Sequence, residues 1–195
     1  MNVIYKSYSP PPINRREILR YAGVKGAADS ETEALLDSVI TEVEKELKYS
    51  VCYTVLPIKI DGNICDFGRF SLHSENLAKC LSKSEKALLF AATVGVGIDR
   101  LISKYSRLSP ARALLLDAFG SERIEALCDA FCKDITGLHN VEISPRFSPG
   151  YGDLPLDTQV DIMSVLSPQK HIGLTLSDSL LLTPTKSVTA FVGTK

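Results

Sequence analysis

The chain has 195 residues, of which 45% are hydrophobic, and a formal net charge of −1 at pH 7. This length and composition are enough to bury a sizeable core. The near-balance of charge gives no electrostatic footprint for nucleic acid or for an anionic membrane. The longest apolar runs, such as 87–98, are shorter than a membrane span, and the first residues lack a signal-peptide pattern. We therefore expect a cytoplasmic protein that binds neither nucleic acid nor membranes.

The N-terminal part is expected to form an extension and one short helix over residues 1–30. Asn14–Gly23 has a helical pattern that Gly23 ends. Ser30 and Glu33 have the spacing of a capping box, which predicts a second helix to about Tyr49. Apolar residues recur at the helical period along this helix and predict its buried face: Leu35, Leu36, Val39, Ile40, Val43 and Leu47.

The middle of the chain alternates strand and helix patterns. Asp61-Gly62 suits a tight turn and predicts a β-hairpin between 51–60 and 63–72. Ser74–Leu81 is expected to be a short helix. Residues 88–95 are apolar on both faces, as in a buried central strand, and Gly97–Arg107 is expected to be helical.

Ser109-Pro110 supplies a cap and a first-turn proline for another helix. Gly120 is expected to divide or kink this helix before a second segment to Thr136. An apolar stripe predicts the buried face of that segment: Ile124, Leu127, Cys128, Phe131 and Ile135. At roughly 100° per residue, Asp129 lies about 140° from the centre of the stripe and is expected to point away from the core.

The last third is expected to contain a loop at 146–151, a helix at 156–166 and two strands within 180–193, separated by Pro184. There is no internal repeat. The mixed order of elements favours an α+β fold around an antiparallel sheet over a doubly wound fold. We expect a single domain spanning 1–195.

Most segments that could form a catalytic or binding site are explained as well by a purely structural role. Thr93–Gly97 follows a strand and opens a helix, but it lacks the third glycine of a dinucleotide loop, so a tight turn is favoured. Asp153 and Asp157 are expected to be solvated loop charges. His171 suits a helix C-terminus. No hydrolase, zinc-protease, phosphate-loop or kinase signature is present, and no catalytic residue is predicted.

The cysteines are odd in number and scattered, at 52, 65, 80, 128 and 132, and free thiols are expected. Cys128 and Cys132 lie one helical turn apart. A metal site needs two further ligands, and the histidines at 73, 139 and 171 have no accompanying spacing. Core thiols are therefore favoured over a metal site.

The loop Arg146-Phe-Ser-Pro-Gly-Tyr151 has the residue types of a small-molecule site. The guanidinium of Arg146 offers a planar fork of donors matched to a carboxylate. Pro149-Gly150 favours a turn in which the backbone can approach a ligand closely. Tyr151 supplies a flat ring with a polar tip. The alternative is an ordinary surface turn with Arg146 in a surface salt bridge.

Four segments extend this pattern: LCDAF at 127–131, RFSPGYGDLPLDTQ at 146–159, HIGLTLSDSLLLTP at 171–184 and KSVTAFVG at 186–193. In order and spacing they resemble the C-terminal activation (reactivation) domain of cobalamin-dependent methionine synthase, which binds S-adenosylmethionine. The length is about that of the domain alone. The resemblance therefore implies the fold of that domain, as a free-standing protein.

The resemblance also implies roles for individual residues. Arg146 pairs the carboxylate of S-adenosylmethionine, Asp129 accepts from its ammonium, and Tyr151 closes the pocket or faces the corrin. Backbone groups around Phe147–Gly150 bind the nucleoside. The implied binding residues are Asp129, Arg146, Phe147, Pro149, Gly150 and Tyr151.

The implied function is reductive methylation of cob(II)alamin. Cobalamin is held by a partner corrinoid subunit of methionine synthase, because the chain lacks the Asp-x-His-x-x-Gly motif of many corrinoid modules. Flavodoxin or a similar donor supplies the electron. The chain is then a component of the methyltransferase activity of methionine biosynthesis rather than a complete enzyme.

The chain departs from the family at three places. Met1–Arg16 offers no equivalent of an acidic N-terminal contact, a ligand-binding tyrosine would fall after Lys195, and Asp157-Thr-Gln159 stands where the family has His-Thr-Glu. Two alternatives therefore stay open: a non-enzymatic corrinoid-protein binding or assembly module, and an independent small-molecule methyltransferase.

Overall fold

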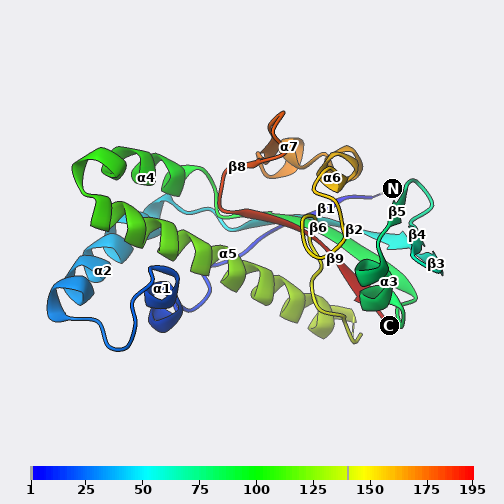
Figure 1. Cartoon of the computed structure of the whole chain (residues 1–195), viewed down its shortest axis with the longest axis horizontal. Coiled ribbons are helices and arrows are strands. Elements are labelled where there is room, and N and C mark those ends of the chain that lie inside the picture. Colours follow the sequence, from blue (N-terminus) through cyan, green and yellow to red (C-terminus); the bar gives the residue numbers. More distant parts are fainter. Residues whose placement is uncertain (1, 140) are drawn as a thin grey trace.

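The computed structural model describes residues 2–139 and 141–195. At its centre is a four-stranded antiparallel sheet (Figure 1), whose order is β1 (Ile4–Ser7), β2 (Ser50–Pro57), β6 (Lys86–Thr93) and β9 (Ser187–Thr194). Strand β6 pairs with β2 and β9 along its whole length and is buried at all but its first residue. The prediction of a buried central strand is confirmed.

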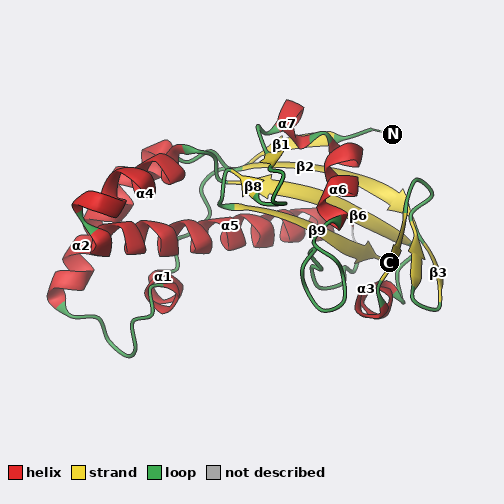
Figure 2. Ribbon diagram, turned by 45° about the horizontal axis from the view of Figure 1, so that its top comes forward, coloured by secondary structure: helices red, strands yellow, loops and turns green. Residues whose placement is uncertain are grey.

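Helices α1, α2 and α4 gather at one end of the molecule, and α5 runs from there along the sheet (Figures 1 and 2). Side chains from one face of the sheet, such as Tyr53 and Phe90, pack with Phe131 of α5 in the larger core. The helices on this side are α1 (Arg15–Tyr21), α2 (Ser30–Val43) with the 3-10 turn η1 (Glu44–Glu46), α4 (Gly97–Leu108) and α5 (Pro110–His139).

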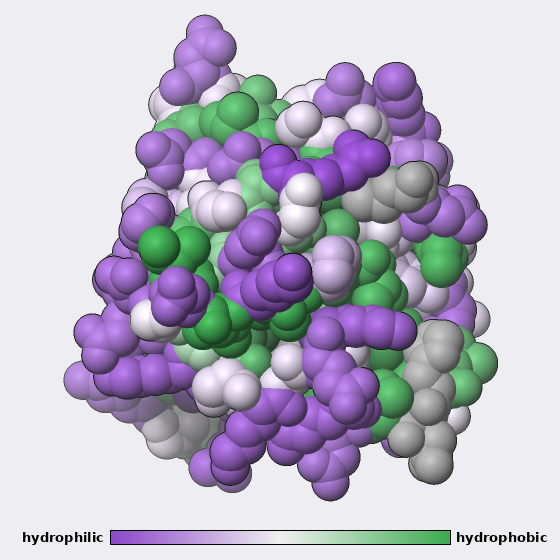
Figure 3. Space-filling view, turned by 90° about the vertical axis from the view of Figure 1, so that its right-hand side faces the viewer, coloured by the Kyte–Doolittle hydropathy of each residue, from purple (hydrophilic) through white to green (hydrophobic). Residues whose placement is uncertain are grey.

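The opposite face of the sheet is covered by shorter elements. Because side chains alternate between faces along a strand, Leu89 and Ala91 point here and pack with Phe191 in a second core. The covering elements are β3 (Lys59–Asp61), β4 (Ile64–Asp66), β5 (Ser71–His73), α3 (Glu75–Leu81), α6 (Thr158–Leu166), α7 (Pro168–His171), β7 (Thr175–Leu176) and β8 (Leu182–Thr183). The end of the molecule that carries α3 is mostly hydrophilic, with small apolar areas between the polar side chains (Figure 3).

These elements confirm the predicted α+β class with a central antiparallel sheet. The predicted stripe of α5 is buried, with Leu127, Cys128 and Phe131 fully inaccessible. The turn at Asp61-Gly62 is also confirmed, but it joins β3 to β4. The preceding residues form β2 of the main sheet instead of the expected long hairpin.

The predicted break at Gly120 is wrong, because α5 continues unbroken from Pro110 to His139. A Cβ at position 120 would lie 2.6 Å from Cδ1 of Ile98 and 2.8 Å from Cγ of Lys186. Glycine therefore serves close packing against Ile98 of α4 and against Lys186, which directly precedes β9.

The start and end of α2 also differ from the prediction. Its N-cap is Asp29, whose side chain accepts a hydrogen bond of 2.7 Å from the backbone N–H of Thr32. The helix ends at Val43 and tightens into η1, and the chain is extended at Leu47. Aspartate and serine are about equally good N-caps, so the sequence pattern does not separate Asp29 from Ser30.

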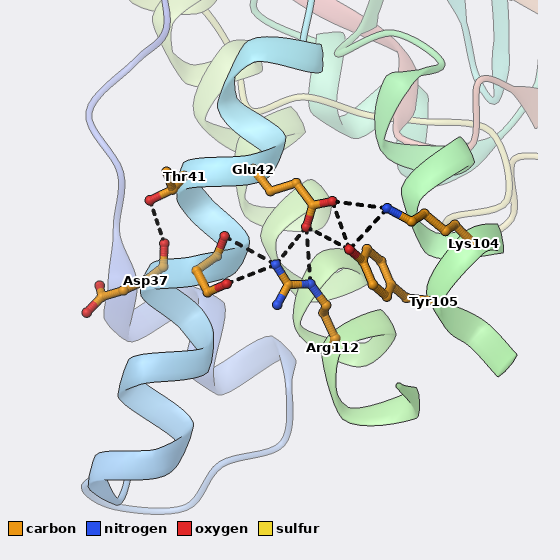
Figure 4. Close-up of polar contacts among 7 residues, drawn as sticks. Asp37, Thr41, Glu42, Lys104, Tyr105 and Arg112 are labelled. Carbon is orange, nitrogen blue, oxygen red and sulfur yellow. Dashed lines mark hydrogen bonds and ion pairs between the residues drawn. The ribbon is translucent and has the colours of Figure 1, made fainter. Parts of the chain in front are cut away.

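A polar network joins α2, α4 and α5 at the end of the molecule opposite α3 (Figure 4). The carboxylate of Glu42 on α2 accepts hydrogen bonds from the Tyr105 hydroxyl at 2.9 Å and from Nη2 of Arg112 at 2.6 Å. Burial by itself raises the pKa of Glu42, but these two partners lower it overall. The carboxylate therefore stays charged and links α2 to α4 and α5.

Candidate functional site

Residues 143–147 lie against the outer edge of the sheet. Phe147 forms an antiparallel bridge with Phe191 of β9, with backbone N–H to O distances of 2.9 and 2.8 Å. A second bridge joins Ile143 to Thr194. These contacts cover the free edge of β9 and fix the backbone of Arg146 beside the sheet.

The side chain of Arg146 reaches α5 and contacts two carboxylates there. Its Nη2 lies 2.7 Å from Oε2 of Glu125, and its Nη1 lies 2.6 Å from Oδ1 of Asp129. Glu125 and Asp129 are four residues apart, so they share one face of the helix. The structure thus brings together Arg146 and Asp129, which lie 17 residues apart in the chain. The prediction that Asp129 points off the core is confirmed.

Two thiols lie close to this ion pair. Burial raises the pKa of both Cys128 and Cys132, and the nearby Arg146 acts in the opposite direction. Burial alone would lower the pKa of Arg146, but Cys128 and the two carboxylates raise it overall. The guanidinium stays charged. As expected, the five cysteines are free.

A pocket of about 520 Å³ opens beside Arg146, and we call it the edge pocket. Its walls come from the loop Arg146–Tyr151, from Glu125 of α5, from Gln159 of α6, from Leu182 of β8 and from Ser187–Thr189 of β9. The predicted residues Arg146, Phe147, Pro149 and Tyr151 line it, whereas Gly150 and Asp129 do not.

Gly150 shapes the turn that carries the pocket wall. It has φ +86°, which favours glycine, and its N–H donates to the carbonyl of Leu154 at 2.9 Å. Pro149 before it is buried. The side chain of Tyr151 after it is left 69% exposed.

Asp153 ties this turn to α3. Its carboxylate accepts hydrogen bonds from the Ser74 hydroxyl and, at 2.6 Å, from the backbone N–H of Glu75. The hydrogen bond from Ser74 is the main cause that lowers the pKa of Asp153. Asp153 is an exposed loop charge, as expected, and in addition it holds the start of α3.

Four polar residues of the edge pocket were not predicted from the sequence: Glu125, Gln159, Ser187 and Thr189. Gln159 and Thr189 are buried, and the Thr189 hydroxyl donates a hydrogen bond of 2.8 Å to Oε1 of Gln159. Gln159 stands on the buried face of α6 with Ile162. A polar residue at the apolar period of a short helix was the available signal.

Asp129 instead lines a second hollow of about 710 Å³, the α1 groove, together with Glu17 and Tyr21 of α1. Glu125 lines both hollows, so they meet at the ion pair of Arg146. Glu17 is an acidic side chain that directly follows Met1–Arg16, the segment that offers no acidic contact of its own.

The segment Thr93–Gly97 is a packing turn, as expected. Gly95 has φ +85°, and its N–H donates to Oγ1 of Thr93 at 3.1 Å. A Cβ on Gly97 would lie 2.3 Å from the carbonyl oxygen of Glu46. The space beside Gly97 is filled by Glu46 of η1 and the space beside Gly95 by Lys48, as in a packing turn.

Residues 2–139 and 141–195 hold neither a cluster of metal ligands nor a membrane-spanning helix. No group of three or more His, Cys, Asp or Glu side chains there is placed to hold a metal ion. Nor does any helix in this part of the chain have both the length and the apolar character to cross a membrane.

Comparison with known proteins gives a match in structure only. No family model and no curated protein matches the sequence. A solved structure described as "Crystal Structure of the MetH Reactivation Domain bound to AdoHcy" superposes with a TM-score of 0.72 at 16% sequence identity. The match covers 99% of this chain and 78% of that chain. The chain therefore has the fold of the MetH reactivation domain, as the sequence resemblance implied.

Proposed function

We propose that this chain binds S-adenosylmethionine in the edge pocket and supplies its methyl group to cobalamin held by a partner corrinoid protein, such as a methionine synthase subunit. The observation that carries the proposal is the ion pair of Arg146 with Glu125 and Asp129 at the wall of a pocket beside a glycine turn. The AdoHcy bound to the structural neighbour supports the same ligand class.

The charges around Arg146 suit an amino-acid ligand. An α-carboxylate can replace one protein carboxylate on the planar fork of Arg146. The α-ammonium can then pair with the carboxylate that was displaced. Charge is balanced before and after the exchange, so the partly buried Arg146 never loses its counter-charge. The edge pocket is large enough to hold a ligand of drug-like size.

The methyl transfer needs no proton transfer to or from the protein. After a donor such as flavodoxin supplies one electron to cob(II)alamin, the methyl group passes from sulfur to cobalt, and S-adenosylhomocysteine leaves as the neutral thioether. No protein acid or base is needed. The contribution of this chain is to hold the sulfonium in position, in the manner of a binding module.

A second candidate is an assembly module that binds the corrinoid protein without a ligand. Four large apolar side chains, Tyr151 in the pocket loop, Leu156 before α6, Val160 on α6 and Leu181 before β8, favour a protein contact, because each is at least 41% exposed. Apolar side chains exposed to this degree are a feature that interaction surfaces share. An independent small-molecule methyltransferase is the third reading, and it requires turnover without a corrinoid protein.

The test of ligand binding is isothermal titration of the full chain with S-adenosylmethionine. Arg146→Ala should weaken binding by about 1.5–3 kcal/mol, the contribution of a charged hydrogen-bonding partner. Arg15→Ala is a matched control, because Arg15 also contacts two carboxylates, Glu33 and Asp37, but lies outside the edge pocket. No binding by the wild-type chain at millimolar ligand would contradict the proposal.

A pull-down with a cobalamin-loaded methionine synthase subunit, with and without S-adenosylmethionine, separates the three readings. Absorbance spectra of cob(II)alamin under a reducing system then report methylation. Ligand-dependent methylation supports the proposal. Capture of the partner that does not depend on the ligand, without methylation, supports the assembly module, and methyl transfer without the partner supports the independent enzyme.

A further inference from the structure

A buried polar pair, Gln159 and Thr189, forms part of the wall of the edge pocket. Gln159 is 6% exposed and Thr189 is 2% exposed. The hydrogen bond from the Thr189 hydroxyl to Oε1 of Gln159 is 2.8 Å long. Burying polar groups is costly unless they are hydrogen-bonded. A carboxamide held in this way beside a pocket suits the recognition of a polar edge of a ligand.

The pair lies at a distance from the charged end of the pocket. Arg146 precedes Phe147, which bridges to Phe191 on β9. Thr189 is two residues away along the same strand, which is about 7 Å. Arg146 turns to α5 on one side of the sheet, whereas Gln159 belongs to α6 on the other. A ligand whose amino-acid end binds Arg146 therefore extends its far end towards Gln159.

We propose that Gln159, oriented by Thr189, recognises the adenine of the ligand and excludes purines that carry an oxygen at position 6; this inference rests on the proposed function. A carboxamide can pair with adenine in two places. It accepts from the exocyclic amino group through its oxygen and donates to a ring nitrogen through its NH₂.

Thr189 makes this arrangement selective. Because its hydroxyl donates to Oε1, the amide oxygen and NH₂ have fixed places in the pocket wall. Hypoxanthine has a carbonyl oxygen where adenine has the amino group, so two acceptors would face each other. Turning the amide over would take this acceptor away from the buried hydroxyl proton of Thr189, which is unfavourable.

The test is isothermal titration of the full chain with S-adenosylhomocysteine and S-inosylhomocysteine, which differ in the group at position 6 of the purine and in the proton that hypoxanthine carries on the adjacent N1. The wild-type chain should prefer the adenosyl compound by about tenfold or more. Thr189→Val keeps the shape but removes the hydroxyl, and it should reduce this preference to about threefold or less. Thr189→Ser keeps the hydroxyl and most of the preference. Gln159→Leu should abolish it.

Circular dichroism and thermal melts of each variant show whether the fold is kept, and Thr189→Ser separates loss of the hydroxyl from a packing change in β9. Equal affinity of the wild-type chain for the two thioethers would overturn this inference alone. So would an unchanged preference in Thr189→Val and Gln159→Leu. Binding of neither compound by the wild-type chain would overturn the proposed function and this inference with it.

Discussion

Glu122 and Arg123 are neighbours on α5 and form a buried ion pair, with Nε of Arg123 2.5 Å from Oε2 of Glu122. Their side chains are 5% and 1% exposed. Arg123 also donates to the carbonyl oxygens of Pro11 and Pro12 at 2.6 and 2.8 Å, and Glu122 accepts from the backbone N–H of Asn14 at 3.0 Å. The pair therefore fixes the N-terminal segment against α5 and shapes one wall of the α1 groove.

Removing one member of this pair should be strongly destabilising. Glu122→Ala leaves the guanidinium of Arg123 buried without its carboxylate, and we expect a loss of about 3–5 kcal/mol in the free energy of unfolding. Urea denaturation followed by circular dichroism measures it. Glu17→Ala is the control, because it breaks the exposed pair of Glu17 with Arg20 and should change the stability far less. Equal losses of unfolding free energy in the two variants would show that the buried pair contributes no more to stability than the exposed pair.

Two glycines of α5 should respond to alanine with opposite signs. Gly120→Ala places a methyl group 2.6 Å from Ile98 and should destabilise the protein by about 1–3 kcal/mol through overpacking. A Cβ on Gly137 meets nothing within 4 Å, so Gly137→Ala should stabilise the helix by up to about 1 kcal/mol. Denaturant midpoints of the two variants compare them directly. A stabilising Gly120→Ala would mean that α4 and β9 lie further from α5 than the structure places them.

The cap that Asp153 gives to α3 should make stability depend on pH at the acidic end. The pKa of Asp153 is lowered from its ordinary value of 3.8, chiefly by the hydrogen bond from Ser74. A carboxyl group whose pKa is lower in the folded state stabilises that state above the unfolded pKa. This contribution is lost as the pH falls through the folded value.

Asp153→Asn should therefore be less stable than the wild-type chain at pH 7, and the difference should shrink as the pH drops below about 4. Thermal melts of both chains across this range test it. Asp157→Asn is a matched control in the same loop, because the side chain of Asp157 makes no capping hydrogen bond to α6. A gap between wild type and Asp153→Asn that stays constant with pH would contradict the capping role.

The sequence predicts those parts of the site whose residues lie close together in the chain, and it does not predict contacts between distant elements. The loop at 146–151 was recognisable because its arginine, glycine turn and tyrosine are close together in the chain. The outward direction of Asp129 followed from helical geometry alone. The contact between Arg146 and Asp129 was not predictable from spacing, because it depends on how the loop returns along β9 to meet α5. The predicted helix break at Gly120 was wrong for the same reason. The side chain that requires a glycine there, Ile98, belongs to α4 and is distant in the sequence.

By itself the sequence determined the local elements: the apolar stripe of α5, the central strand β6, and the turns at Gly62 and Gly150. Those features arise from side-chain periodicity and backbone preference over a few residues. Only the tertiary structure decided that Glu125, Gln159 and Thr189 line one pocket, because they come from α5, α6 and β9. These three elements meet only when the sheet and its two covering layers are assembled.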